Sequence, residues 1–339
     1  MSQMNWDREV DVLVVGTGNG GLTAAVCNWE MGTKDVLIIE KQDKVGGTSA
    51  TSGGGIWIPN SHYAKEAGAE DNPQDARAYL MNTLFGEDVP EEMIDIYLEK
   101  SPEMLKFLHD RTDVRYESLA EYPDYYTNME GARAGHRSLE PAPIMASELG
   151  ENWKNMTWTH FMMRMFNRIH FTQVEAHLLM VQLPGWKKLL ARLMWDYIRD
   201  IPWRLKTPIS RRLACGSAGV ARLYLSVLKR EIPLEFNTQM VELIAEGDTV
   251  LGAVIECNGQ RQRVRAAKGV IVASGGFEKN QALRERYLPA PTNTDWSAGN
   301  PANEGDALLA GLELGAKTRL MNDAWWTTTL CVPDEPAPP

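Results

Sequence analysis

The sequence predicts an α/β fold, and three features indicate it. An apolar run at 10–15 is followed by a glycine-rich turn, a helical stretch and a second apolar run at 36–39. A strand meander covers 233–266. It leads into a further apolar run at 269–272 that ends in Ala-Ser-Gly-Gly. Short continuous apolar runs are typical of strands that are buried on both faces of a parallel sheet.

Length and composition describe an acidic globular chain. At about 150 residues per domain, 339 residues correspond to roughly two domains. The 45 acidic side chains outnumber the 35 basic ones, and the net charge of −10 disfavours nucleic-acid binding, which needs clustered cations. Four scattered cysteines without a CxxC pair predict neither disulfides nor a zinc site, and fit a reducing compartment such as the cytoplasm. The chain shows no secretory leader pattern and no apolar run long enough to cross a bilayer.

The turn after the first apolar run carries a dinucleotide-binding pattern. Gly16, Gly18 and Gly21 satisfy G-x-G-x-x-G, and Gly20 lies in the same turn. In such a unit the first glycine makes the tight turn, the second lets the backbone approach a pyrophosphate, and the third lets the helix pack on the strand. The N–H groups at the helix start then face the phosphates. Glu40 closes the second apolar run, where a carboxylate accepts hydrogen bonds from ribose hydroxyls.

A second glycine cluster indicates which dinucleotide binds. Five of the ten residues at 46–55 are glycine, and four of the others are Ser or Thr. Exposed backbone and small hydroxyls suit the phosphate, ribitol and ring edges of a flavin, whereas a nicotinamide site has no evident use for them. A flexible linker is the alternative, but the apolar run at 56–59, which holds a tryptophan, argues against it. We expect contacts to a flavin from Gly46, Gly47, Thr48, Ser49, Ser52, Gly53 and Gly54.

These motifs resemble a known family. The runs DVLVVGTGNGGLTAA, EK (Glu40 and Lys41) and VGGTSATSGGGIWIP are similar to flavoproteins that include fumarate reductase subunits and 3-oxosteroid dehydrogenases. The SGGGIWIP ending is most similar to the 3-ketosteroid dehydrogenase branch. The resemblance implies an α/β, Rossmann-like FAD-binding domain of the glutathione-reductase type over 1–290, with a helical insertion at about 61–210. It also implies the start of an α+β substrate domain over 291–339.

The resemblance implies FAD as the cofactor, with further contacts in the second half of the chain. The residue at Val241 contacts the adenine through its backbone in this family, and Ala273, Ser274 and Gly275 match its second dinucleotide contact. Asp306 belongs to an element that lies near the flavin there. The electron acceptor is expected to be an external one such as a quinone, because only one dinucleotide fingerprint is present at full strength.

Three tyrosines around Pro123-Asp124 are candidate catalytic residues. We rank Tyr125 first, then Tyr126 and Tyr122, because the steroid dehydrogenases carry an active-site tyrosine in a similar loop. Half-buried loop aromatics are the alternative interpretation. The resemblance implies dehydrogenation of an apolar 3-oxosteroid, at Δ1 first and Δ4 second, in which a tyrosinate-like base takes a proton next to the carbonyl and a hydride passes to the flavin. The competing hypotheses are a fumarate reductase-like enzyme for an unsaturated acid, and a non-catalytic homologue that binds flavin or membrane.

The middle of the chain holds helical segments of two kinds. We expect one amphipathic helix from Pro90 and a second that begins after Ser101 as its N-cap. Residues 153–206 contain nine Lys or Arg against three Asp or Glu, a local charge of +6. Their basic amphipathic helix, near 183–199, is either a lid packed on the flavin domain or a peripheral membrane contact. The three histidines of this segment lack metal-ligand spacing, and no metal site is expected.

The last residues bear on domain count. Flavin domains of this type return near their C-terminus for a final strand and helix, and no such pattern follows Trp326. We therefore expect the chain to be the N-terminal part of an enzyme longer by about one domain. In the family, a tyrosine from that later part donates to the substrate carbonyl.

Overall fold

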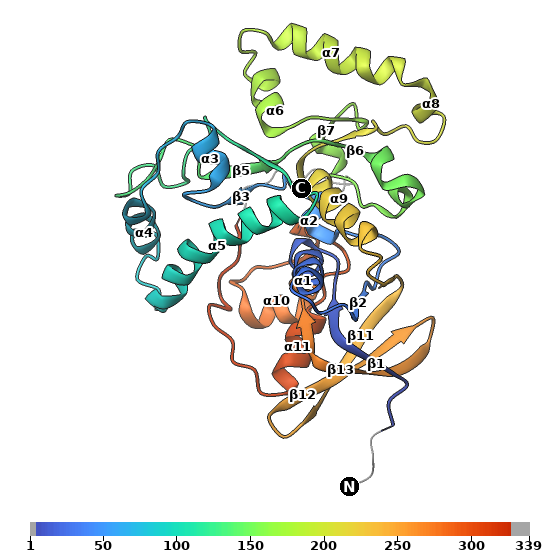
Figure 1. The fold of residues 1–339 in the computed structure, drawn as a ribbon. Helices are drawn as coiled ribbons and strands as arrows, with labels where there is room; N and C mark the ends of the chain where they lie inside the picture. The colour runs from blue at the N-terminus through green and yellow to red at the C-terminus, as the bar shows by residue number, and fades with distance from the viewer. Residues whose placement is uncertain (1–4, 327–339) are drawn as a thin grey trace.

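A six-stranded sheet organises the computed structural model, which describes residues 5–326 (Figure 1). Its strand order is β10-β2-β1-β13-β12-β11. The first four of these strands run parallel, and β12 and β11 continue the sheet as an antiparallel meander. The strands are β1 (Arg8–Val15), β2 (Val36–Ile39), β10 (Leu234–Glu235), β11 (Thr238–Glu246), β12 (Thr249–Cys257) and β13 (Gln260–Val272). The expected α/β class is confirmed.

Both faces of the parallel strands are buried, as their apolar runs predict. Val12 and Val14 belong to one hydrophobic core, beneath helices α1 (Asn19–Glu30) and α9 (Cys215–Lys229). Leu13 and Val15 point to a second core, which also holds Ala310 of helix α11 (Asp306–Glu313). Alternate residues of Val12–Val15 therefore fill two different cores, and the polar residues of β1 are confined to its first half.

The runs at 260–266 and 269–272, which the sequence separates, form one strand. β13 pairs with β12 along its first part and with β1 along most of its length. The pairing register shifts between Val10 and Val12, which pair with Ala266 and Gly269. This β-bulge takes up one extra residue and keeps the chain extended through the change of partner.

The insertion between β2 and α9 is mixed rather than purely helical. It holds helices α2 (Gly47–Thr51), α3 (His62–Glu66), α4 (Pro73–Asn82) and α5 (Glu91–Arg111). It also holds the small sheets β3-β5-β4, β6-β9 and β7-β8, built from β3 (Ile56–Trp57), β4 (Tyr116–Ser118), β5 (Ser138–Pro141), β6 (Ile144–Met145), β7 (Arg164–Met165), β8 (Ile169–His170) and β9 (Arg212–Leu213). Two 3-10 segments, η1 (Ala146–Asn155) and η2 (Phe161–Met163), complete it.

The expectation of two helices that meet at Ser101 is wrong. Helix α5 runs through Ser101 and Pro102 without a break. Ile94 on one side of the proline, and Leu105 and Leu108 on the other, are buried on the same side of the helix. The apolar stripe is thus continuous, and its burial outweighs the hydrogen bond that Pro102 removes.

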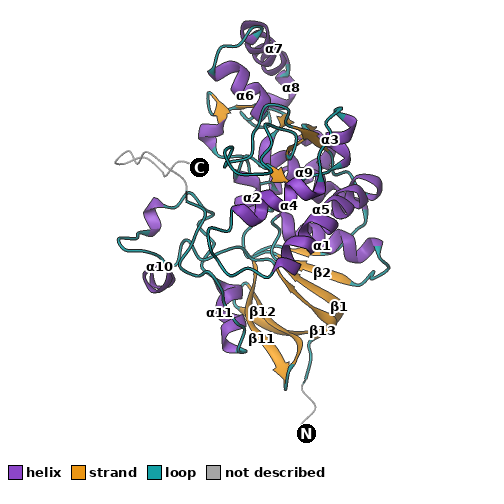
Figure 2. Cartoon of the chain, turned by 90° about the vertical axis from the view of Figure 1, so that its left-hand side faces the viewer, coloured by secondary structure: helices purple, strands orange, loops and turns teal. Residues whose placement is uncertain are grey.

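Three helices form an arm at the end of the molecule that lies far from the sheet (Figures 1 and 2). They are α6 (Gln173–Met180), α7 (Trp186–Arg199) and α8 (Ile201–Arg204). The arm has a small core of its own around Ile169, Leu189 and Leu193. Its longest helix is therefore not a lid over the sheet.

The segment that follows β13 packs beside the sheet. Helix α10 (Gln281–Tyr287), the 3-10 turn η3 (Thr294–Trp296) and α11 follow in that order. Residues 327–339 of the expected substrate domain lie outside the described residues. Within 5–326, no helix has the length and apolar character needed to cross a bilayer.

Candidate functional site

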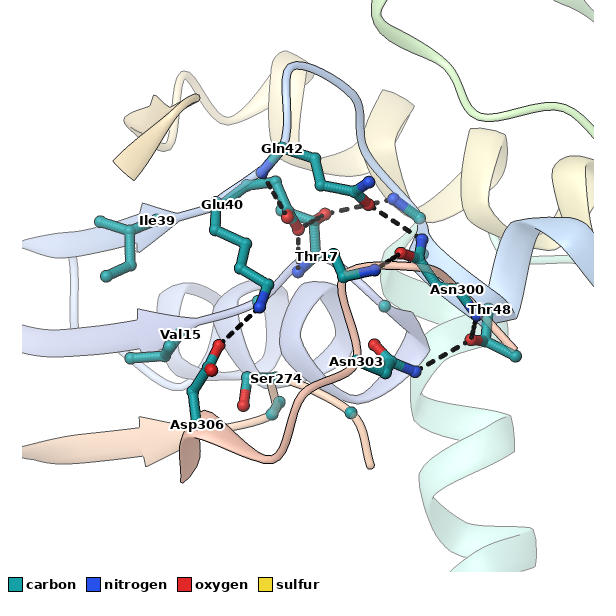
Figure 3. Close-up of a pocket in the computed structure, with 18 of the residues that line it drawn as sticks. Val15, Thr17, Ile39, Glu40, Gln42, Thr48, Ser274, Asn300, Asn303 and Asp306 are labelled. Carbon is teal, nitrogen blue, oxygen red and sulfur yellow. Dashed lines mark hydrogen bonds and ion pairs between the residues drawn. The ribbon is translucent and has the colours of Figure 1, made fainter. Parts of the chain in front are cut away.

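A cavity of about 320 Å³ opens where β1, β2 and β13 end (Figure 3). The carboxyl ends of parallel strands meet at one edge of a sheet, and ligands of open α/β sheets bind outside that edge. Segments far apart in the chain form its walls. They are Val15–Gly20, Ile39–Gln42, Gly46–Ser49, Thr238–Met240, Ala273–Gly275 and Asn300, Ala302, Asn303 and Asp306.

The glycine-rich turn is held by close backbone packing. Gly16 has φ +102°, and a Cβ there would lie 2.4 Å from the carbonyl oxygen of Ala273. A Cβ at Gly21 would lie 2.0 Å from the carbonyl oxygen of Gly16. These positions have no room for a side chain, so the turn brings the start of α1 against the end of β13. The N–H groups of that helix start then lie at the cavity, as an anionic ligand requires.

Glu40 is buried, and three donors fix its carboxylate. One oxygen accepts the backbone N–H of Thr17 at 3.1 Å and also the Thr17 hydroxyl. The other accepts the backbone N–H of Gln42 at 3.0 Å. Thr17 in turn accepts the N–H of Gly46 at 3.1 Å. The first strand end, the second strand end and the second glycine cluster are thereby tied together around one carboxylate (Figure 3).

Polar contacts between the segment at 300–306 and residues 41–48 form a further wall of the cavity. Asn300 donates its backbone N–H to the Thr48 hydroxyl at 3.0 Å and its side-chain amide to Gln42 at 2.9 Å. Asn303 donates to the same hydroxyl at 3.1 Å. The Lys41 ammonium lies 2.8 Å from Asp306. Lys41 and Asp306, both predicted to contact the cofactor, therefore form an ion pair in the cavity wall.

Most of the predicted cofactor residues line this cavity. The predicted residues among its walls are Gly16, Gly18, Gly20, Glu40, Lys41, Gly46, Gly47, Thr48, Ser49, Ala273, Ser274, Gly275 and Asp306. The others, Gly21, Ser52, Gly53, Gly54 and Val241, lie outside the set that lines it. Gly54 packs on α9, where a Cβ would lie 2.6 Å from the nitrogen of Gly216. Val241 lies one position beyond Met240, which does line the cavity.

Sequence reasoning did not single out Thr17, Gln42 or Asn300. The hydrogen bond between Asn300 and Gln42 joins segments 258 positions apart, so no local pattern marks these two residues. A polar residue inside the glycine-rich turn, at Thr17, was the one available signal.

Two buried polar atoms show that the cavity fits a polar ligand. The Ser274 hydroxyl and the side-chain oxygen of Asn19 are buried without a hydrogen-bond partner in the described structure, and both residues line the cavity. Buried polar groups normally have partners. Helix-start amides, a glycine turn and unpartnered polar atoms together suit the phosphates and ribose of FAD.

The three candidate tyrosines lie on the loop between β4 and β5, outside the residues that line the cavity. Tyr125 is 76% exposed, and Tyr122 and Tyr126 are also exposed. The Tyr122 and Tyr125 ring centroids lie 6.4 Å apart, whereas the Tyr126 ring lies 5.0 Å from that of Phe85. Burial, and then a hydrogen bond with Tyr125, raises the pKa of Tyr122 to about 12.

A buried ionic cluster anchors the tyrosine loop. Asp124, between the tyrosines, accepts from the Arg137 guanidinium at 2.8 Å and from the indole of Trp57 at 2.7 Å. Arg137 is 1% exposed and also binds Asp71 at 2.9 Å. Burial opposes ionisation of Asp71, but its hydrogen bonds with Arg137 prevail and lower its pKa. Trp57 follows the second glycine cluster, so the buried ionic cluster connects the tyrosine loop with the glycine-rich segment.

Fold and cavity together define a dinucleotide-binding protein of the parallel α/β type. The chain matches the FAD-binding-domain family over residues 11–338 and belongs to it. The predicted cofactor, FAD, is confirmed by this membership.

Individual relatives agree with the resemblance seen in the sequence. A 3-oxosteroid 1-dehydrogenase of Mycobacterium tuberculosis is 35% identical over 97% of this chain and 58% of its own length. A 4-oxocyclohexanecarboxylate 2-dehydrogenase of Sinomonas cyclohexanicum is 31% identical over 93% of this chain and 51% of its own. The crystal structure of a 3-ketosteroid Δ1-dehydrogenase from Sterolibacterium denitrificans superimposes with a TM-score of 0.93 at 38% identity, over 97% of this chain and 59% of that one. The chain thus spans a little over half the length of these relatives.

Proposed function

We propose that this chain carries the FAD-binding part of a 3-oxosteroid dehydrogenase, with Δ1 as the first choice and Δ4 as the second. The observation that carries the proposal is the match to the Sterolibacterium denitrificans enzyme, whose structure holds 1,4-androstadiene-3,17-dione. A Δ4-(5α)-dehydrogenase from Rhodococcus jostii aligns with a TM-score of 0.63 at 21% identity, and this likeness supports only the fold.

In this proposal the cavity residues bind and orient the cofactor. Glu40 accepts hydrogen bonds from the ribose hydroxyls, and its three donors hold the carboxylate in one orientation. The N–H groups at the start of α1 and the hydroxyl of Ser274 bind the pyrophosphate. FAD, when bound, supplies the acceptor for a hydride.

Proton removal is the task of the tyrosine loop. We assign it to Tyr125 first, then to Tyr126 and Tyr122. A free tyrosine ionises near pH 10, so a tyrosine base requires surroundings that lower this value. Anchoring of the loop through Asp124 favours a fixed position for the phenol.

The test is anaerobic flavin reduction in the full-length protein. Addition of 4-androstene-3,17-dione should remove the absorbance of oxidised flavin, and Tyr125→Phe should slow this step by about 10²–10⁴-fold while FAD remains bound. Glu117→Gln, an exposed change on the neighbouring strand, is the matched control. Reduction by 4-oxocyclohexanecarboxylate but not by the steroid would contradict the proposal and favour the cyclic-ketone branch. Reoxidation by fumarate without any response to steroid would favour the fumarate reductase-like hypothesis.

We also propose that the helical arm makes a peripheral membrane contact and that the electron acceptor is a quinone. The outward side of α7 carries Trp195 and Ile198, which are 63% and 49% exposed, next to the exposed cations Lys188 and Arg192. Apolar residues flanked by cations are typical of helices that lie on anionic lipid surfaces. Both a quinone and a steroid dissolve in such a membrane. Sedimentation with phosphatidylglycerol vesicles, compared with Trp195→Asp, tests the contact.

A further inference from the structure

A second cavity, of about 370 Å³, lies between the helices of the arm and the short strands β6, β8 and β9. It shares no lining residue with the FAD cavity. Four apolar side chains form part of its wall: Met145, Ile169, Leu193 and Trp203. The reaction proposed above makes no use of this space.

The remaining wall is rich in cations. Four arginines line the cavity, against two aspartates. Three of these guanidinium groups have carboxylate partners: Arg199 binds Asp196 at 2.9 Å, Arg211 binds Asp200 at 2.9 Å, and Arg212 binds Glu175 at 2.9 Å. The fourth, Arg204, has no carboxylate partner among the described residues. His170, also in the wall, stays neutral, because burial first and then the charges of Arg164 and Arg212 lower its pKa to about 3.

The Arg204 guanidinium is fixed in position and keeps one donor without a partner in the described structure. One terminal nitrogen donates to the carbonyl oxygen of Ile198 at 2.6 Å, and the group lies 5.4 Å from the centroid of the Tyr197 ring. Its Nε is buried and has no hydrogen-bond partner in the described structure. A buried charged donor without an acceptor is unfavourable, so an anionic oxygen from a ligand would relieve it.

We propose that this cavity binds the phosphate of an anionic phospholipid, with Arg204 as the binding residue and the apolar wall against the start of an acyl chain. The inference rests on the membrane contact proposed for the arm. Guanidinium groups bind phosphate oxygens in a fork geometry, and basic pockets beside membrane-facing helices bind lipid head groups. Leu205, which follows Arg204, is 84% exposed, and Ile201 is 57% exposed. The cavity therefore lies beside apolar side chains that can enter a lipid surface.

A water-soluble lipid allows binding in the cavity to be tested independently of the membrane-facing surface. Binding of dihexanoyl phosphatidylglycerol, kept below its micelle concentration, is measured by titration calorimetry with the full-length protein. We expect one saturable site, about tenfold weaker or more in Arg204→Gln, as loss of a charge-assisted hydrogen bond implies. Arg204→Lys should retain part of the affinity. Lys154→Gln removes an equal charge from an exposed cation outside the cavity and should leave binding unchanged.

Each measurement tests a different part of the proposal. Equal weakening by Arg204→Gln and Lys154→Gln, or no saturable binding, would overturn the proposal. Equal binding of dihexanoyl phosphatidylcholine would overturn the role of the anionic charge. Binding of inorganic phosphate as tight as that of the lipid would assign the site to free anions instead. Vesicle binding lost in Trp195→Asp, with soluble-lipid binding kept, would show that the cavity and the membrane contact are separate features. Soluble-lipid binding without any vesicle binding in the unaltered protein would refute the membrane contact alone.

Discussion

Substitution of Gly16 by alanine tests whether the glycine-rich turn depends on close packing against β13. The new Cβ would lie 2.4 Å from the carbonyl oxygen of Ala273 and 2.9 Å from its carbonyl carbon. Both atoms belong to backbone at the end of a central strand, so they cannot rotate away. The φ of +102° at Gly16 is also unfavourable for alanine.

Gly32 allows the two costs to be separated. It has nearly the same φ, +104°, but no heavy atom of the described structure, its chain neighbours apart, lies within 4 Å of the place that a Cβ would take. Gly32→Ala should therefore cost only backbone strain, about 1–3 kcal/mol of unfolding free energy. Gly16→Ala should cost that and about 1–3 kcal/mol more for overpacking.

The assay is urea unfolding of both variants without flavin, at equal m-values, followed by FAD titration of the folded proteins. Gly16→Ala should unfold at lower urea than Gly32→Ala and bind FAD more weakly, because it displaces the wall formed by Ala273. Equal destabilisation of the two variants would refute the reasoning, since it would show that the contact with β13 has no energetic weight.

Three further predictions concern ionisable side chains. Glu40→Gln should weaken FAD binding about tenfold, because hydrogen bonds to a charged acceptor are about twice as strong as neutral ones; fluorescence titration with FAD measures this. Arg137→Met should lower the free energy of unfolding by about 3–5 kcal/mol, because it leaves the buried Asp124 without a cation and Asp71 with only Arg133, 3.7 Å away; urea unfolding measures it. His170 is neutral in the folded protein, with its pKa lowered to about 3, but protonates near pH 6.5 when unfolded. Stability should therefore fall as the pH drops below about 6.5, by about 2 kcal/mol between pH 7 and pH 5, and His170→Gln should remove this part of the pH dependence.

Clear outcomes would contradict each of these predictions. An unchanged FAD affinity in Glu40→Gln would exclude a direct contact with the ribose. A loss below about 1 kcal/mol in Arg137→Met would mean that water reaches the two aspartates. The same fall in stability between pH 7 and pH 5 in the parent and in His170→Gln would assign that fall to other groups.

The sequence was sufficient for features that depend on neighbours in the chain. The strand at 36–39, the turn at Gly16 and the position of Glu40 follow from apolar runs and glycine spacing, and the structure confirms their arrangement. Features that depend on distant segments were not accessible. Asn300 and Gln42 meet only in the folded chain.

One expectation differs from the structure because packing competes with local preference. Pro102 is a helix-breaking residue by local chemistry, but burial on both of its sides keeps α5 continuous. The absent side chain of Gly54 makes room for α9, and its contact with the flavin stays a prediction. The assignment of Tyr125 stays a prediction.

The pairing of β1 with β13 has a consequence for synthesis. Residues 8–15 leave the ribosome roughly 250 positions before their partners at 264–272. At about 5–20 residues per second, this delay is on the order of 10–50 s. Throughout that time the glycine turn lacks the wall formed by Ala273, and an apolar strand edge stays open. We therefore expect FAD to enter after translation of the sheet is complete, and the nascent chain to need protection from aggregation until then.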